Sequence, residues 1–415
     1  MKRYHTIIVG GGPSGMAAAL AGAREGQRVL LVDRCDKIGK KILVTGNGKC
    51  NLTNLVQSPV CYRGDAPDLA GSIFSEFGLS ETKELFDSLG LYTKERNGYV
   101  YPYNEQAASV REAFEIALQQ NKLIDILLET DVNGIKKQKD GFLVSAGKTH
   151  FFCHSLILAT GGLAGPKLGC DGSGYVFAKK MGHHIIKPLP ALTALKSGAP
   201  FLKKISGVRN QAQITLFVEG QPVAKETGEL QWTDYGISGV AVFQVSRFAI
   251  VALEQKKSVS LSLDFVPEKS EEDMANLLET YKKHCPYKTA QEFLNGFFPS
   301  KLVPVLLREA RWEQEQLIKD WKEENMIKLT EILKHFQLRI NGYMGYEKAQ
   351  VTRGGVDLRE LTTHLESCIC PGLFFAGEVT DIDGTCGGYN LQWAFSSGSV
   401  AGEAAFKRNQ IRGAK

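Results

Sequence analysis

Residues 6–15 of the chain read TIIVGGGPSG. A short run of β-favouring residues leads into a glycine-rich turn, and alanines typical of a helix pressed onto a sheet follow at 17–19 and 21. Gly10, Gly12 and Gly15 permit a tight turn, close approach of the backbone to a pyrophosphate group, and close packing of helix on strand. This stretch therefore predicts a strand, a turn and a helix that bind a dinucleotide.

The residues that follow extend the same pattern. We expect the helix to begin near Pro13, so that its first amide groups and the positive end of its dipole face the phosphates. Residues 28–32 read as the second strand, and Asp33 stands at its end. Asp33 follows Gly15 by eighteen residues, close to the spacing of about 20 expected for a carboxylate that binds ribose hydroxyls.

A second glycine turn lies near the other end of the chain. Residues 373–378 read LFFAGE, residues 387–390 read GGYN, and helical periodicity then runs on through Ala405. Glu378 at a strand end is suited to hold ribityl hydroxyls. The turn at Gly387 and Gly388 exposes the amides of a helix start, which stabilises the negative charge of a reduced flavin. The two distant halves together predict one FAD site.

The whole chain predicts an α/β fold: a two-dinucleotide-type FAD-binding, Rossmann-like domain with an inserted β-rich domain and a helical insert. Val132, at the head of an antiparallel meander, is expected to place its backbone near the adenine. An apolar strand over 156–159 is expected to end at Thr160-Gly161. A helix is expected over 105–121. The other expected strands cover 124–128, 134–137, 142–146, 149–153, 214–218, 230–233, 240–245 and 259–263. The expected boundaries are 1–189 and 356–415 for the FAD-binding domain, 190–268 and 335–355 for the β-rich domain, and 269–334 for the helical insert.

Residues 34–54 form a loop rich in glycine, amide and basic side chains. One interpretation is a solvated basic loop. The other is a segment wrapped over the cofactor, which supplies backbone N–H groups and positive charge to phosphates and flavin.

Composition favours a cytoplasmic enzyme. The 415 residues carry 50 basic and 45 acidic side chains, a balance too even to indicate a nucleic-acid partner. No apolar run approaches the roughly 18 residues that a membrane helix needs, and the first strand begins too early to leave room for a signal peptide. The nine cysteines are expected to be reduced thiols, and no spacing indicates a metal site.

With these motifs the chain resembles the bacterial flavoproteins often called YhiN-like or BaiN-like, which include aminoacetone oxidases and enzymes that reduce conjugated keto bile acids. The resemblance covers nearly the whole chain and implies non-covalent FAD, a β-rich insert, a helical insert, and a substrate cleft between the inserts and the flavin. Two positions of one motif depart from the family: Asp234 stands where many members carry histidine, and Val240 where they carry proline. The resemblance rests on residues 10–15, 39–54, 159–162, 172–175, 182–183 and 377–394.

Three functions stay open. The favoured one is a reductase in which NAD(P)H visits the flavin directly and an activated C=C bond of a small organic molecule, such as a steroid or bile acid, accepts the hydride. No second dinucleotide fingerprint occurs in the insert, so a dedicated NAD(P)H domain is not expected. The second is a flavin amine oxidase that uses dioxygen. The third is a flavoprotein that binds RNA or a protein through Lys282, Lys283, Lys288 and Lys301, although the acidic residues nearby favour a solvated mixed-charge face.

No catalytic residue and no oligomeric state is assigned. Cys50, Cys386 and Tyr389 are the side chains near the expected flavin that merit testing as proton donors or redox partners. The residues predicted to bind FAD are Gly10, Gly12, Pro13, Ser14, Gly15, Asp33, Arg34, Lys41, Thr45, Gly46, Gly48, Cys50, Asn51, Val132, Thr160, Gly161, Gly377, Glu378, Asp383, Gly387, Gly388, Tyr389, Asn390 and Leu391.

Overall fold

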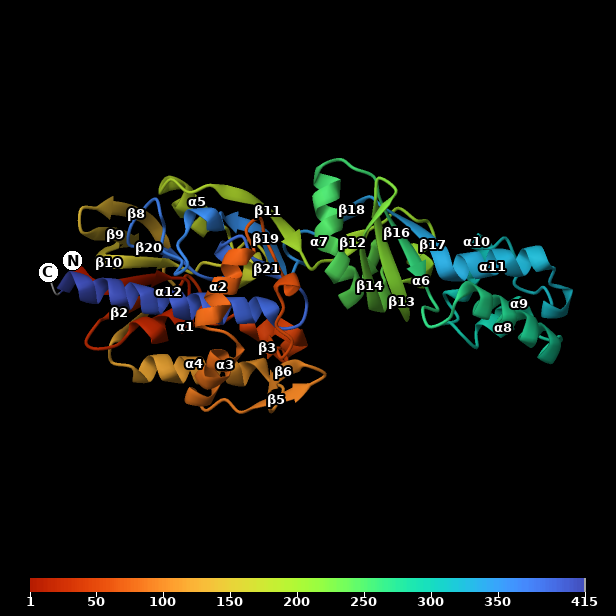
Figure 1. The fold of residues 1–415 in the computed structure, drawn as a ribbon, viewed down its shortest axis with the longest axis horizontal. Helices are drawn as coiled ribbons and strands as arrows, with labels where there is room; N and C mark the ends of the chain where they lie inside the picture. The colour runs from red at the N-terminus through yellow and green to blue at the C-terminus, as the bar shows by residue number, and fades with distance from the viewer. Residues whose placement is uncertain (414–415) are drawn as a thin grey trace. The chain divides into compact units, whose positions relative to one another are not determined.

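The computed structural model describes residues 1–413, which form two compact units (Figure 1). Unit 1 combines both ends of the chain, Met1–Pro190 and the residues from Gln350 onward. Unit 2 is the intervening segment, Ala191–Ala349. Among the described residues, no helix combines the length and hydropathy required to cross a membrane.

A central sheet organises unit 1, with strand order β7-β2-β1-β10-β9-β8 and β20 paired to β10. The strand β10 has two kinds of neighbour. Its first half pairs antiparallel with β9 and its second half pairs parallel with β20, while β1 runs parallel along its length. Unit 1 therefore has an α/β architecture, and the Rossmann-like fold predicted from the sequence is confirmed. The strands are β1 (Lys2–Val9), β2 (Val29–Val32), β7 (Ile124–Leu127), β8 (Val132–Gln138), β9 (Gly141–Ala146), β10 (Thr149–Leu158) and β20 (Leu373–Phe375).

The two expected strands at 149–153 and 156–159 are thus one continuous strand. Ser155 between them is fully buried, and its hydroxyl donates a hydrogen bond to Asn409 Oδ1 at 2.9 Å. This polar residue separates the two apolar runs in sequence but does not interrupt the strand.

Two helices pack against each other on this sheet: α1 (Pro13–Gly22) and α12 (Tyr389–Gly413) (Figure 1). Glycines of α12 set their distance. A Cβ atom at Gly398 would lie 2.3 Å from the carbonyl oxygen of Ser14, and one at Gly402 would lie 2.4 Å from that of Ala18. The absence of side chains therefore lets the two backbones approach closely.

Smaller elements complete unit 1. The hairpins and ribbons are β3 (Thr53–Asn54), β4 (Tyr62–Arg63), β5 (Thr93–Arg96), β6 (Tyr99–Pro102), β11 (Ile185–Ala191), β19 (Val351–Val356) and β21 (Asp383–Gly384). The helices are α2 (Asp68–Glu76), α3 (Leu79–Ser88), α4 (Ala107–Gln120) and α5 (Ser173–Lys180).

Unit 2 holds an antiparallel sheet of order β17-β16-β13-β14-β15-β12-β18, followed by a helical region. The predicted division into a β-rich domain and a helical insert stays a prediction, because the contacts group both into one unit. The strands are β12 (Leu195–Lys196), β13 (Arg209–Val218), β14 (Gln221–Trp232), β15 (Gly236–Ser238), β16 (Val259–Asp264), β17 (Phe336–Ile340) and β18 (Gly342–Tyr343). The helices are α6 (Leu202–Ile205), α7 (Val240–Glu254), α8 (Glu271–His284), α9 (Ala290–Leu294), α10 (Val303–Glu309) and α11 (Glu323–His335).

The strand expected at 240–245 is wrong, because these residues begin α7. Gly239, with φ of +113°, ends the extended chain. Buried Val242, Val245 and Ala249 then recur at intervals of three and four residues, which is the period of a helix face and not of a strand.

Candidate cofactor site

The glycine turn after β1 is built as the motif requires. Gly10 has φ of +109°, and a Cβ there would lie 2.3 Å from the carbonyl oxygen of Ala159. A Cβ at Gly15 would lie 1.8 Å from the carbonyl oxygen of Gly10. Both positions therefore need glycine for the turn itself. The helix α1 begins at Pro13 without a side-chain cap, so its first amides stay available to an anion.

Gly12 has a different reason to be glycine. Its φ is −75°, which any residue adopts, and a Cβ there would meet no heavy atom within 4 Å. Nothing in the fold excludes a side chain at this position. A side chain would instead fill the cavity that Gly12 lines, so the residue fits a cofactor that passes directly over the backbone.

Asp33 is held by the loops on either side of it. Its Oδ2 accepts a hydrogen bond from the Gly11 N–H at 2.5 Å, and its Oδ1 accepts one from the Cys35 N–H at 2.7 Å. Each carboxylate oxygen keeps a second lone pair, and Asp33 lines the cavity. The geometry fits a carboxylate that orients the turn and accepts ribose hydroxyls.

The cavity collects residues from both ends of the chain. It encloses about 950 Å³ of empty space, part of it open to solvent, which is in the range of cofactor sites. Predicted residues that line it are Gly10, Gly12, Pro13, Ser14, Asp33, Lys41, Thr45, Thr160, Gly161, Glu378, Asn390 and Leu391.

Lys41 and Glu378 join the two ends of the chain in this cavity. The Lys41 ammonium lies 2.6 Å from Glu378 Oε2, and Glu378 Oε1 accepts the Thr352 N–H at 3.0 Å. Burial disfavours the ammonium, but the carboxylate outweighs it, so the pKa of Lys41 lies above its ordinary value. The pair places a permanent positive charge and an oriented carboxylate in the wall of the cavity. This contact supports the interpretation of the 34–54 loop as a segment that covers the cofactor.

A smaller adjoining cavity continues past Asp33 and encloses about 410 Å³. Arg34 and Val132, both predicted from the sequence, line it. The Arg34 guanidinium pairs with Asp131 and Asp171, which fixes its side chain. The position fits the adenine end of a dinucleotide, and that assignment stays a prediction.

Two thiols line the main cavity, at Cys35 and Cys170. Burial raises the pKa of each thiol to about 11. Lys41 acts in the opposite direction on Cys170 but does not outweigh burial. Both thiols are therefore protonated near neutral pH and are poor nucleophiles.

Other predicted residues do not line either cavity. Gly388 contacts β3, since a Cβ there would lie 2.6 Å from the carbonyl carbon of Thr53, and Gly387 has φ of +126°. This turn thus has a structural reason for its glycines that does not involve a flavin. The residues outside both cavity linings are Gly15, Gly46, Gly48, Cys50, Asn51, Gly377, Asp383, Gly387, Gly388 and Tyr389.

The three side chains considered as proton donors are placed as follows. Cys50 is fully buried in the core, and burial raises the pKa of its thiol to about 11. The Tyr389 hydroxyl donates to the carbonyl oxygen of Val56 at 3.0 Å, and burial raises its pKa. Cys386 is partly buried at the turn before α12. None of the three lines the main cavity.

Sequence reasoning missed part of the lining. Trp393 and Ala394 follow Asn390 at helical spacing, and this period offered a usable signal. Some of the others lie inside segments that the sequence singled out without being predicted individually, at residues 10–15, 34–54, 159–162 and 377–394. No motif marks the remaining ones, at 168–170 and 350–351, which only the fold brings to the cavity. The missed residues are Gly11, Cys35, Lys37, Gly39, Lys40, Ile42, Ala159, Leu168, Gly169, Cys170, Gln350, Val351, Ile382, Trp393 and Ala394.

Asp381 is a buried carboxyl group beside this cavity. It is 1% exposed and precedes Ile382, which lines the cavity. Its Oδ2 accepts the Asp65 N–H at 2.7 Å. Burial raises the pKa of Asp381 to about 6, so this group changes charge close to physiological pH.

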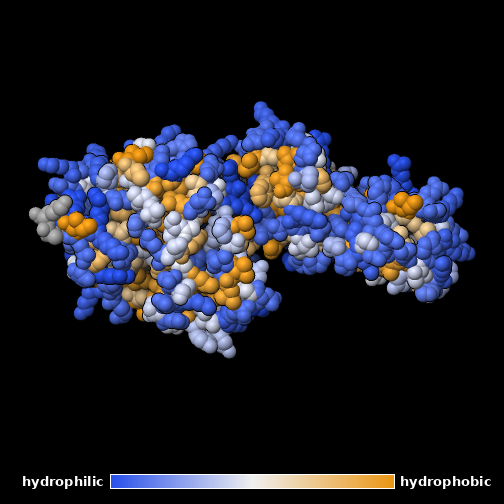
Figure 2. Space-filling view, viewed as in Figure 1, coloured by the Kyte–Doolittle hydropathy of each residue, from blue (hydrophilic) through white to orange (hydrophobic). Residues whose placement is uncertain are grey.

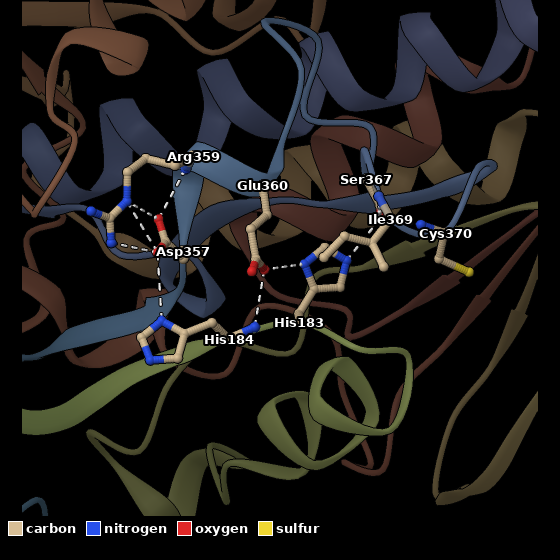
Figure 3. A network of polar contacts seen from close by, with 8 residues as sticks. All are labelled: His183, His184, Asp357, Arg359, Glu360, Ser367, Ile369 and Cys370. Atoms are coloured by element: carbon tan, nitrogen blue, oxygen red, sulfur yellow. Dashed lines mark hydrogen bonds and ion pairs between the residues drawn. The ribbon is translucent and has the colours of Figure 1, made fainter.

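A polar network stands apart from the cavity, around His183 (Figure 3). Ser367 Oγ accepts the backbone N–H groups of Ile369 and Cys370 at 3.1 and 2.7 Å, so its own proton points to His183 Nε2 at 2.7 Å. His183 therefore carries its proton on Nδ1, facing Glu360 Oε2 at 2.9 Å. Ser367 is only 3% exposed, so this carboxylate–imidazole–hydroxyl chain is a structural clasp and not a nucleophile.

Comparisons with known proteins were made for the whole chain. Residues 4–404 match the model of the HI0933-like protein Rossmann domain. The 3-dehydro-bile acid delta(4,6)-reductase of Clostridium scindens is 42% identical over 97% of this chain and 98% of its own length. The ribosomal RNA dihydrouridine synthase of Escherichia coli is 30% identical over 96% of each chain. A solved 3-ketosteroid delta1-dehydrogenase of Sterolibacterium denitrificans has the same fold, with a TM-score of 0.52, 11% identity, and coverage of 98% of this chain and 100% of that one.

Proposed function

The chain belongs to the HI0933-like Rossmann family and is an FAD-dependent oxidoreductase; from that premise we propose that it reduces a C=C bond conjugated to a carbonyl group in a small, steroid-like molecule. The observation that carries this proposal is the 42% identity over nearly the full length to a 3-dehydro-bile acid delta(4,6)-reductase. NAD(P)H is the proposed electron donor.

The names of the two curated relatives point to one type of chemistry. A delta(4,6)-reductase of a 3-dehydro bile acid saturates double bonds near a ketone. A dihydrouridine synthase adds two hydrogens to a uracil ring. In both cases a hydride and a proton add across a double bond that a carbonyl group polarises. The shared chemistry supports an ene-reductase more than an amine oxidase.

The residues of the cavity suit an FAD cofactor, which supplies the hydride chemistry when bound. The uncapped amides at the start of α1 would bind a phosphate, for which the bare backbone at Gly12 leaves room. Asp33 accepts ribose hydroxyls. Glu378, held by Lys41 and the Thr352 N–H, accepts hydroxyls of the ribityl chain.

Anaerobic turnover tests the proposal directly. FAD-loaded protein is mixed with NADH or NADPH and a 3-oxo-4,6-diene bile acid, and the dienone absorbance and product mass are followed. We expect loss of the absorbance and a product heavier by the mass of added hydrogen, with the saturated ketone as an unreactive control. Flavin that NADH and NADPH reduce but the dienone does not reoxidise would contradict the proposed substrate class.

The amine-oxidase alternative is tested on the same preparation. Aminoacetone in air, without a nicotinamide, should consume dioxygen if that alternative holds. We expect no oxygen uptake above the rate without amine.

Ribosomal RNA is the second candidate substrate, favoured by 30% identity to the dihydrouridine synthases. The lysines singled out in the helical region give it little support, because the Lys282 ammonium is bound to the carbonyl oxygen of Trp321 and α8 begins with Glu271, Glu272 and Asp273. Retention on heparin at moderate salt, together with dihydrouridine formation in ribosomal RNA transcripts, would favour this candidate over the steroid.

A further inference from the structure

A second concavity of unit 1 lies outside the cofactor cavity. Twelve residues drawn from the segments 55–62 and 67–79 line it, whereas Val56, Val60 and Ser75 of these segments do not. It encloses about 1010 Å³ of empty space, part of it open to solvent. We call it the α2 pocket. Its walls are mainly apolar, with Tyr62 and Phe74 packed at a ring-centroid distance of 4.4 Å. Size and lining are those of sites that hold a small organic molecule.

The strongest indication is a glycine that the fold does not require. Gly71 lies inside α2, where glycine weakens a helix relative to alanine. Among the glycines of residues 1–412, only Gly12 and Gly71 lack both a left-handed φ and any heavy atom within 4 Å of an added Cβ. Gly12 lines the cofactor cavity and Gly71 lines the α2 pocket. In both cases the space that a side chain would take is open and belongs to a concavity.

The rim of the α2 pocket is unusually apolar for exposed surface. Leu55 is 39% exposed and lines the pocket, and the adjoining Val56 and Val60 are 62% and 78% exposed. Figure 2 shows hydrophobic surface on unit 1 in the region of α2 and β3. Contiguous exposed apolar surface around a concavity is typical of a binding site.

The pocket walls are also joined to the helix that borders the cofactor cavity. The Tyr389 hydroxyl donates to the carbonyl oxygen of Val56 at 3.0 Å, and Gln392 Nε2 donates to that of Gly78 at 3.2 Å. The Phe74 ring lies 5.8 Å from the ring of Trp393, which lines the cofactor cavity. One aromatic layer therefore separates the two spaces.

We propose that the α2 pocket is a second ligand site, distinct from the cofactor cavity, for a neutral, flat and largely apolar ring molecule that carries a hydroxyl group. Apolar and aromatic walls favour the ring system. Asp68 is the charged residue of the lining, so a hydroxyl donor is favoured there and an anionic group is disfavoured. The site does not depend on the reaction proposed above.

Fluorescence of Nile red, a neutral apolar dye, tests the site on FAD-loaded protein without any turnover. We expect saturable binding to the unaltered chain and displacement by androsterone, a saturated hydroxysteroid without a C=C bond to reduce. At Gly71 an added Cβ would meet no heavy atom within 4 Å, so Gly71→Leu extends a side chain into the open concavity and should weaken dye binding at least tenfold. Ser75→Leu adds an equal apolar side chain to an exposed position of the same helix outside the lining, and should leave binding unchanged.

Leu55→Glu, a change at an exposed rim residue, provides a second variant that should fold and should weaken binding at least fivefold. Equal dye affinity in Gly71→Leu and the unaltered chain would overturn the proposal, as would an equal loss in Ser75→Leu or the absence of saturable binding. Displacement of the dye by an anionic bile salt but not by androsterone would overturn the proposed ligand class.

Discussion

At the scale of single residues, two glycines of the same motif do different work. Gly12 leaves space for a ligand, whereas Gly15 leaves space for the carbonyl oxygen of Gly10 at 1.8 Å from an added Cβ. We expect Gly12→Val to change the unfolding free energy of the apoprotein by no more than about 1 kcal/mol, the usual range of an N-cap preference. FAD binding should fall by two orders of magnitude or more. Gly15→Val should instead prevent folding.

The measurement pairs denaturant unfolding of the apoprotein with flavin titration. Full FAD affinity in Gly12→Val would show that the cofactor does not pass over this backbone, and equal destabilisation by both valines would remove the distinction between them.

Asp33 supports a second prediction at this scale. Its carboxylate accepts two backbone N–H groups and is proposed to accept ribose hydroxyls. A hydrogen bond to a charged group contributes about 1.5–3 kcal/mol, so Asp33→Ala should raise the dissociation constant of FAD roughly 10- to 100-fold. Flavin titration of the apoprotein gives the constant, and its circular dichroism spectrum checks the fold. An unchanged constant would show that Asp33 orients only the turn.

At the scale of elements, the His183 clasp links the end of α5 to the segments that follow β19 (Figure 3). Burial lowers the pKa of His183 below its ordinary value of 6.5, and Glu360 only partly opposes this effect. The unfolded chain therefore binds more protons than the folded chain between the two pKa values. The stability contributed by neutral His183 is present above pH 6.5 and is lost as pH falls through the folded pKa.

We predict that His183→Gln flattens the pH dependence of unfolding. The slope of the unfolding free energy between about pH 7.5 and pH 5.5 should decrease by up to about 1.4 kcal/mol per pH unit, the contribution of one proton. His184→Gln is the matched control, because the neighbouring imidazole is exposed, with 64% of its side chain accessible. Urea titrations at each pH give the slopes. Equal slopes for the unaltered chain, His183→Gln and His184→Gln would show that His183 does not contribute to the pH dependence of unfolding.

Elements also show what sequence could and could not predict. The strand, turn and helix at residues 6–22 were predictable because every signal is local. The continuous strand β10 and the helix α7 were not read correctly: a buried Ser155 looked like a break, and the apolar run at 240–245 fits a strand when its period is not followed further. Short apolar runs do not distinguish the two structures without the residues that flank them.

At the scale of the whole molecule, the candidate site depends on contacts between distant segments. Motifs marked Lys41 and Glu378 separately, but their ion pair spans 337 positions and follows from the fold. Cys170 and Val351 line the same cavity and carry no motif, so sequence could not place them. What sequence predicts best is the local backbone of the glycine turn, to which we assign the phosphates. What it misses is the wall contributed by segments that only tertiary structure brings together.

The last prediction concerns how FAD distributes stability over the chain. Every residue that lines the cofactor cavity belongs to unit 1. Bound FAD therefore opposes only those unfolding events that disrupt its binding site. A ligand at 100 times its dissociation constant adds about 2.7 kcal/mol. We therefore expect FAD to slow hydrogen exchange in residues 6–15, 33–45 and 378–394, while β13 and β14 of unit 2 keep the exchange rates of the apoprotein. Mass spectrometry of exchanged peptides from holoprotein and apoprotein gives the comparison. Protection of β13 and β14 equal to that of the glycine turn would mean that the two units open as one, and the cofactor would then stabilise the entire chain and not unit 1 alone.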